Sequence, residues 1–248
     1  MSGEPEVEVS ASADTLATST AQRAVRTLGE ALAARDTAHL VLTGGGVLEQ
    51  VMTAIASSSD DLDWSRVHVW WGDERYVPHD SDDRNDLPAF AKLLDHVDVD
   101  VANVHRMPAS DAGFDDAEAA AQAYAAELAQ HSGGGVTPAF DVALIGIGPD
   151  GHCCSLFPHH PVLDVTGTPT AAVHDSPKPP PDRLTLTFTG LGAVREIWFV
   201  ASGDGKAEAA AQALSGSAST ADVPSSRPRG TERTLWLLDR DAASKLQG

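Results

Sequence analysis

The sequence predicts an α/β fold in which helices cover a mostly parallel, doubly wound sheet. Short apolar runs have the character of buried strands, and several are followed by a glycine-rich turn and then by a helical pattern. Residues 39–43, for example, run into three glycines at 44–46, after which 47–56 resumes a helical spacing. The same order of strand, glycine turn and helix recurs between 196–201 and 207–214. The chain contains no internal repeat.

The remaining elements follow from local patterns along the chain. Leucines and a valine recur at helical spacing among alanines between 14 and 35, which predicts a helix. Alternation of apolar and polar residues predicts a strand at 184–188. By the same criteria we expect strands at 67–71, 142–145, 170–174 and 234–238, an irregular connection or short strand at 97–107, and helices at 87–94, 115–130 and after Asp239.

Length and composition suit one sizeable domain without a membrane span. The 248 residues, 42% of them hydrophobic, can bury a substantial core. We expect residues 1–12, which are acidic and small, to form a flexible tail and residues 13–248 to form a single domain. No apolar run approaches the roughly 20 residues that a membrane-spanning helix needs. The acidic N-terminus also lacks the pattern of a secretory signal.

The cysteines indicate the cellular compartment, and the net charge excludes some classes of binding partner. Cys153 and Cys154 are adjacent and cannot join distant loops, so we expect a reducing cytoplasm. We also expect a monomer or weak homodimer. The formal net charge of −19 argues against nucleic acid or an anionic membrane as a partner. It would also repel an anionic metabolite at long range. An anionic substrate would therefore require cations concentrated at its site.

The stretch 140–152 carries the strongest signal for an active site. A buried strand ends there in a turn with three glycines, whose missing Cβ atoms let the backbone approach a ligand closely. The turn delivers Asp150 and His152 to the carboxyl end of the strand, where open α/β sheets bind ligands. His152 is a candidate general base, with Asp150 as its orienting partner. The alternative is a hydrogen-bonded structural histidine.

A second glycine turn is a candidate anion site. Thr43, Gly44, Gly45 and Gly46 lie between a predicted strand and a predicted helix. Free N–H groups and the helix dipole face such a turn, which makes it a common cradle for anions. The alternative is that these glycines only form a tight turn.

Charged residues at two further strand ends are also candidates. Asp73 and Arg75 follow the strand at 67–71. Burying a charged group there costs free energy unless the group is solvated, paired with an opposite charge or bound to a ligand. A surface ion-pair cluster is the alternative. Lys206 stands at a predicted helix start after two glycines, a position suited to meeting a phosphate.

Two nucleotide-binding motifs are present only in part. The residues 146–151 fit G-x-G-x-x-G, but Pro158 and Pro161 interrupt the helix that a dinucleotide site requires. Gly205-Lys206 resembles the end of a Walker A motif, but Ala207 replaces the serine or threonine that would bind magnesium. We therefore expect no nucleotide cofactor.

A zinc site around His152 is also disfavoured. Cys153 and Cys154 are adjacent, whereas tetrahedral zinc sites use spaced cysteine pairs. We interpret both cysteines as small buried side chains and His159 and His160 as loop residues, so no metal is expected.

Four segments together resemble the 6-phosphogluconolactonase family. They read WGDERYVP at 71–78, GIGPDGH at 146–152 with SLFP at 155–158, RLTLT at 183–187, and GK at 205–206. They occur in the family's order and span most of the chain. The resemblance implies a Rossmann-like α/β/α sandwich and hydrolysis of a sugar-phosphate lactone in the oxidative pentose phosphate pathway, without a metal or organic cofactor.

The resemblance also implies roles for individual residues. His152 matches the histidine proposed as general base, and Arg75 matches an active-site arginine. Arg183 and Lys206 match positions expected to hold the substrate phosphate together with the turn at 43–46, and Asp73 is placed with the substrate-binding residues.

The sequence departs from the family at three places. The first turn usually continues with serine or threonine and proline, whereas here Val47 and Leu48 follow the glycines, so Thr43 and backbone N–H groups are left to contact the phosphate. A Ser-Asn pair is Arg-Asn at 84–85. Cys153-Cys154 replaces Thr-Ala, a change of packing.

Two rival functions share this fold. An amino-sugar phosphate deaminase/isomerase normally carries a glutamate five positions after the histidine, but here that position is Phe157, which cannot transfer a proton. A catalytically silent sugar-phosphate sensor would bind without turnover, and His152 disfavours it.

Overall fold

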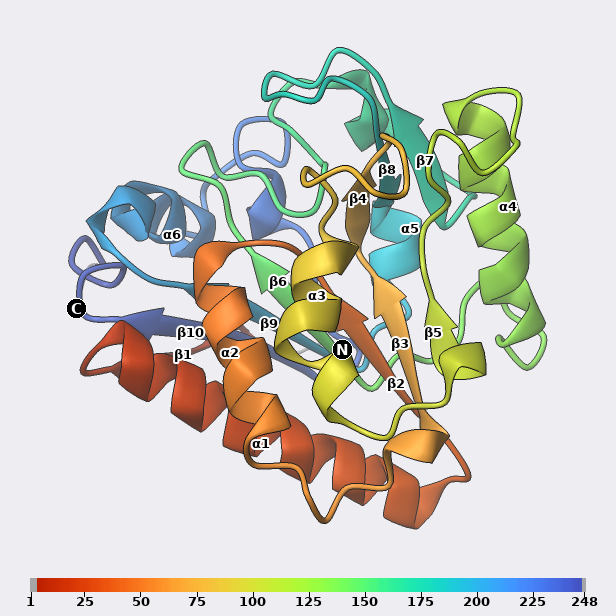
Figure 1. Cartoon of the computed structure of the whole chain (residues 1–248). Coiled ribbons are helices and arrows are strands. Elements are labelled where there is room, and N and C mark those ends of the chain that lie inside the picture. Colours follow the sequence, from red (N-terminus) through yellow and green to blue (C-terminus); the bar gives the residue numbers. More distant parts are fainter. Residues whose placement is uncertain (1–3, 247–248) are drawn as a thin grey trace.

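The protein, described here by a computed structural model over residues 4–246, is built on a seven-stranded sheet (Figure 1). The strand order is β1-β10-β9-β6-β2-β3-β5, and every neighbouring pair is parallel. The strands are β1 (Glu6–Ser10), β2 (Ala38–Leu42), β3 (Val67–Trp71), β5 (Val104–His105), β6 (Val142–Gly146), β9 (Glu196–Ala201) and β10 (Arg233–Asp239). The predicted mostly parallel α/β architecture is confirmed.

A small antiparallel sheet stands beside the carboxyl ends of the central strands. It has the order β4 (Asp73–Arg75), β8 (Arg183–Leu186) and β7 (Thr170–Val173). β4 follows β3 after a single residue, Gly72, whose N–H donates to Leu42 O and whose carbonyl accepts from Leu186 N. The second sheet therefore begins directly at the end of the first.

Helices flank both sheets. α1, α2 and α3 lie side by side over one face of the central sheet, and α4 packs against β7 and β8 (Figure 1). The helices are α1 (Ala13–Ala34), α2 (Gly46–Ala56), α3 (Asp86–Lys92), α4 (Ala117–Gln130), α5 (Phe188–Leu191) and α6 (Ala207–Leu214). None of these helices is both long and apolar enough to cross a membrane.

The core explains why the apolar runs became strands. All five residues of β3 are buried, as are the first four of β6, because neighbouring strands and packed helices cover both faces. Four tryptophans are fully buried in and around the sheet. They are Trp70, Trp71, Trp198 and Trp236.

The prediction of a flexible tail over 1–12 is wrong for its central part. Glu6–Ser10 is an edge strand that pairs in parallel with β10, while residues 1–3 lie outside the described part of the chain. The glutamates that suggested a solvated tail have partners: Glu6 pairs with Arg233 at 2.5 Å, and Glu8 pairs with Arg23 at 2.6 Å. Neutralised in this way, the alternating segment can form a strand.

The prediction of a helix after Asp239 is also wrong. The residues that follow form turns, and the Asp239 carboxylate accepts hydrogen bonds from the backbone N–H groups of Gly203 and Ala242. This side chain ties the end of β10 to the end of β9, so the chain bends back locally instead of starting a regular helix.

Candidate active site

The site lies where the order of the strands reverses. From β2 the chain runs outward through β3 to β5, whereas β6, next to β2 on its other side, leads toward β9 and β10. Open α/β sheets bind ligands at such a switch point, outside the carboxyl ends of the strands. A cavity of about 420 Å³ is found at this place. Among the residues predicted from the sequence, its lining includes Thr43, Gly44, Gly45, Gly46, Asp73, Arg75, His152, Arg183 and Lys206.

Asp150 does not line the cavity but contacts His152 from behind. The Nδ1 atom of His152 lies 2.5 Å from Asp150 Oδ1, and the imidazole ring packs against Phe157 with 4.7 Å between ring centroids. An ionised carboxylate only accepts hydrogen bonds, so Nδ1 of His152 carries a proton and donates it to Asp150. The turn thus presents an imidazole whose orientation is fixed by Asp150.

Gly148 makes room for this pair. A Cβ atom at position 148 would lie 2.0 Å from His152 Nδ1 and 2.3 Å from Asp150 Oδ1, far inside van der Waals contact. The Gly148 N–H also donates to His152 O at 2.8 Å, and its carbonyl accepts from Gly151 N at 3.0 Å. The glycine therefore closes the turn and allows the two side chains to meet above it.

Lys178 is a site residue that the sequence analysis missed. Its Nζ lies 3.1 Å from Asp150 Oδ2 and 3.1 Å from His152 Nδ1. Because Nδ1 already carries a proton, the ammonium donates to the carboxylate, and the imidazole and the lysine share Asp150. The available signal was a lone cation within the proline-rich loop 175–181, which we had interpreted only as a stiff connection.

The pKa of Asp150 reflects these two partners. Burial raises it, but the hydrogen bond from His152 and the ion pair with Lys178 outweigh burial, so the pKa lies well below its usual range. Asp150 is therefore an anion at neutral pH and can hold the imidazole in a single tautomer.

Arg183 holds the loop that carries Lys178. Its guanidinium donates to the carbonyls of Lys178, Pro179 and Pro180 at 3.0 to 3.2 Å, and it lies over the Phe157 ring, 5.4 Å from the centroid. Burial lowers its pKa, and Arg75 adds to this effect although Asp73 opposes it. Nε and Nη2 of Arg183 make these bonds. Of the guanidinium nitrogens, only Nη1 therefore remains to contact the phosphate that the family resemblance places near Arg183.

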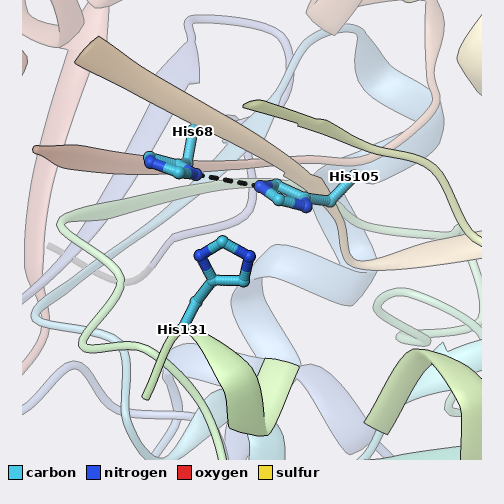
Figure 2. A group of neighbouring side chains, drawn as sticks. All are labelled: His68, His105 and His131. Atoms are coloured by element: carbon cyan, nitrogen blue, oxygen red, sulfur yellow. Dashed lines mark hydrogen bonds between the residues drawn. The ribbon is translucent and has the colours of Figure 1, made fainter. Parts of the chain in front are cut away.

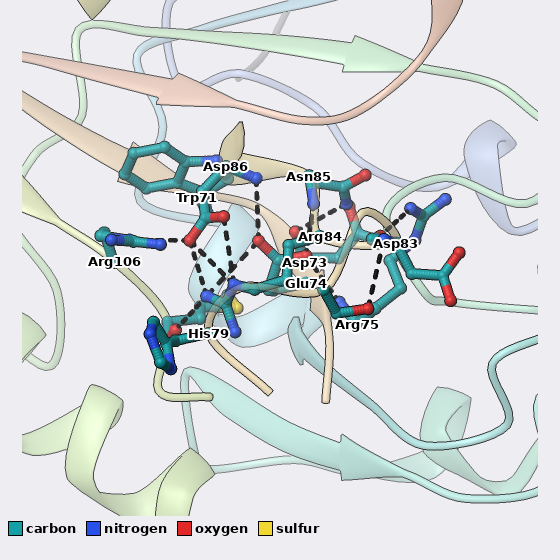
Figure 3. Close-up of polar contacts among 12 residues, drawn as sticks. Trp71, Asp73, Glu74, Arg75, His79, Asp83, Arg84, Asn85, Asp86 and Arg106 are labelled. Carbon is teal, nitrogen blue, oxygen red and sulfur yellow. Dashed lines mark hydrogen bonds and ion pairs between the residues drawn. The ribbon is translucent and has the colours of Figure 1, made fainter. Parts of the chain in front are cut away.

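A buried carboxylate on β4, the strand next to Arg183, organises a further part of the cavity. Glu74 accepts hydrogen bonds from the backbone N–H groups of Arg75, Asn85 and Asp86 at 2.6 to 3.0 Å (Figure 3). Burial raises the pKa of Glu74 to about 7, although Arg84 opposes this. The network joins β4 to the segment before α3 and so fixes where Arg75 and Asn85 lie.

Asp73 and Arg75 flank Glu74 on β4 and line the cavity. Asp73 Oδ2 accepts from Ser155 Oγ at 2.8 Å, which connects the two sequence segments of the site. Arg75 Nη1 donates to Asp83 O, whereas its buried Nε has no hydrogen-bond partner in the described part of the chain (Figure 3). Such an unpaired buried donor costs free energy.

The start of α2 can hold an anion. Gly45 precedes α2, no side chain caps this helix, and the first residues of the helix line the cavity. Lys206 also lines the cavity and contributes a positive charge, with its Nζ donating to Ile147 O at 2.7 Å. Burial, and then the charge of Lys178, lower the pKa of Lys206.

Thr43 lines the cavity and also makes two hydrogen bonds that the sequence analysis did not predict. Its Oγ1 donates to Leu144 O at 3.2 Å and accepts from Gly146 N at 3.1 Å, which ties the end of β2 to β6. The hydroxyl therefore joins the two glycine turns.

Comparison with known proteins identifies the family. Residues 11–236 match the family model described as glucosamine-6-phosphate isomerases/6-phosphogluconolactonase. The chain is 45% identical over 244 residues to the 6-phosphogluconolactonase of Mycobacterium leprae, which covers 98% of each chain. It is 45% identical over 252 residues to that of Streptomyces coelicolor, covering 99% of this chain and 96% of the relative.

A solved structure agrees with this assignment. The crystal structure of a 6-phosphogluconolactonase from Shewanella baltica superposes with a TM-score of 0.80 at 27% identity, over 96% of this chain and 99% of that one. The chain therefore belongs to the family of glucosamine-6-phosphate isomerases and 6-phosphogluconolactonases.

Proposed function

We propose that this protein hydrolyses 6-phospho-D-glucono-1,5-lactone to 6-phosphogluconate, with His152 as the general base. The observation that carries the proposal is the oriented imidazole at a cavity that also gathers four cations, in a chain of net charge −19. The full-length relatives named as 6-phosphogluconolactonases support the same activity. The cations are Arg75, Lys178, Arg183 and Lys206.

The chemistry needs a base, a water molecule and stabilisation of an oxyanion. His152 Nε2 takes a proton from water as the water oxygen attacks the lactone carbonyl carbon. The tetrahedral intermediate then collapses, the ring C–O bond breaks, and the imidazolium returns its proton to the leaving oxygen. The carboxylic acid ionises, so each turnover releases one proton. A positioned base contributes ~10²–10⁴-fold to such a step.

Arg75 and Asp150 have distinct duties in this mechanism. Asp150 stabilises the imidazolium that forms during attack and prevents the ring from turning, as an orienting carboxylate does. Arg75 lines the cavity, and its guanidinium faces the negative charge that develops on the carbonyl oxygen. No nucleophilic side chain is required, because a δ-lactone is already an activated ester.

The substrate phosphate occupies the end of the cavity formed by the start of α2 and Lys206. Helix N-termini bind phosphate through free N–H groups and the helix dipole. Binding a dianion there would offset the mutual repulsion of Lys178 and Lys206. The lactone ring is then held between the phosphate site and His152.

The deaminase alternative lacks a necessary group. Phe157 stands five positions after His152, is fully buried and packs against the imidazole, so no carboxylate is available at that position for proton transfer.

The test is proton release on addition of freshly prepared 6-phosphogluconolactone, corrected for spontaneous hydrolysis. We expect turnover by the native chain and at least a ~10²-fold lower kcat for His152→Ala, with binding of 6-phosphogluconate retained. Turnover by His152→Ala close to that of the native chain would place the base elsewhere. Binding without turnover by the native chain would favour the sensor.

A further inference from the structure

Three histidines distant in sequence meet at the other end of β3. His68 lies on β3, His105 ends β5, and His131 follows α4. One ring nitrogen from each residue lies within 4.8 Å of the others, and Figure 2 shows the His131 ring facing the gap between His68 and His105. This cluster takes no part in the mechanism above.

The spacing suits a transition metal ion. Zn²⁺ binds imidazole nitrogens at ~2.0–2.1 Å, which places two tetrahedral ligands ~3.3 Å apart. His68 Nδ1 and His105 Nε2 are 2.9 Å apart, joined by a hydrogen bond (Figure 2). Their rings are nearly parallel, at 7° to one another. Both rings must therefore turn, and His68 Nδ1 must give up the proton of this hydrogen bond, before the two nitrogens can bind one ion. His131 is exposed and free to close the third side.

A carboxylate already supports one of the three ligands. His105 Nδ1 lies 2.6 Å from Glu127 Oε1, so Nδ1–H donates to the carboxylate and Nε2 keeps its lone pair toward the cluster. Trp70 stacks on the same ring, with 3.6 Å between centroids and 9° between planes. A histidine fixed in this way by a carboxylate is a recurring feature of metal sites, where the partner sets the tautomer and increases ligand basicity.

We propose that His68, His105 and His131 bind a divalent transition metal ion of the zinc type, with water as the fourth ligand and Glu127 hydrogen-bonded to His105. Imidazole ligands suit zinc, copper, iron and nickel, and three histidines with an open position form a common zinc set. The ion joins β3, β5 and the end of α4. Asp73 lies five positions after His68, roughly 16 Å away at ~3.3 Å per residue, so the ion stabilises the fold and is not part of the lactone site.

Titration calorimetry with Zn²⁺ on chelator-treated protein tests the proposal, with three variants. His131→Ala removes the exposed ligand without opening the core, Glu127→Gln removes only the supporting charge, and His96→Ala removes an exposed histidine outside the cluster as the matched control. We expect one ion per chain in the native protein and His96→Ala. Affinity should fall at least ~10²-fold in His131→Ala and ~10–100-fold in Glu127→Gln.

Two further readouts separate this site from adventitious binding. Co²⁺ should give the intense visible absorption of a tetrahedral site in the native chain and lose it in His131→Ala, and Zn²⁺ should raise the unfolding temperature only where the site is intact. Equal affinity in the native chain and His131→Ala, or no binding of Zn²⁺ at millimolar concentration, would overturn the proposal. Neither outcome bears on lactone hydrolysis.

Discussion

Substitution of Gly148 by alanine tests the active-site geometry without touching a reacting group. The added Cβ would lie 2.0 Å from His152 Nδ1 and 2.3 Å from Asp150 Oδ1, against an ordinary contact of 3.4 Å or more. The two side chains must therefore move by more than an ångström. A misplacement of about 1 Å can cost ~10²-fold in rate, so we expect kcat for the phosphorylated lactone to fall at least that far.

Stability should change little, because the side chains that must move are at the cavity rim. The side chain of His152 is 18% exposed and that of Asp150 33% exposed, so both can rotate toward solvent. Gly29→Ala is the matched control: a Cβ there meets nothing within 4 Å, and alanine favours the interior of α1. Proton-release kinetics and thermal unfolding of both variants decide the matter. Near-native kcat in a folded Gly148→Ala protein would refute the catalytic pair.

Three further substitutions separate phosphate binding, positioning and packing. Lys206→Met should raise KM for the phosphorylated lactone ~10–150-fold, the equivalent of ~1.5–3 kcal/mol for a lost charged hydrogen bond, and leave unphosphorylated gluconolactone unaffected; equal losses on both substrates would contradict this. Lys178→Met should lower kcat about tenfold on both lactones, and an unchanged kcat would remove Lys178 from the proposed site. The double replacement Cys153→Thr with Cys154→Ala should keep native activity, because burial raises the pKa of both thiols and neither acts as a thiolate. Loss of activity in a folded double variant would show that the cysteines take part in the reaction.

The sequence predicted the strands and the candidate site where local pattern and tertiary structure agree. β9 and α6 begin and end at the predicted residues, because an apolar run and an alanine-rich run have sharp limits there. The edge strand β1 escaped prediction because its stability comes from a register with β10 and from ion pairs to distant arginines. β4 escaped because only three residues form it, and charged residues at a strand end resemble a loop.

The candidate site shows the same limit at the level of single side chains. Both glycine turns could be predicted from the sequence, since clustered glycines directly after an apolar run are locally unusual. In the second turn, Asp150 and His152 strengthened the signal. Lys178 could not be predicted, because a lysine among prolines has no local signature, and its role depends on Asp150 from a separate segment. The histidine cluster was hidden for the same reason: His68, His105 and His131 are brought together only by the pairing of β3 with β5 and the return of α4.

The positive charge of the cavity arises from the tertiary structure, because its cations come from separate segments of the chain. Arg75 comes from β4, Lys178 from the proline loop, Arg183 from β8 and Lys206 from the turn before α6. Each is held by its own bonds to carbonyls or carboxylates, so the cavity keeps its charge even though burial and like charges lower the pKa of Lys206. In the proposed function, a phosphate dianion would offset the mutual repulsion of these cations, while the net negative charge of the chain would make other sites less attractive to it. We therefore expect selectivity for an anionic lactone to follow from the contrast between this cationic cavity and the acidic surface.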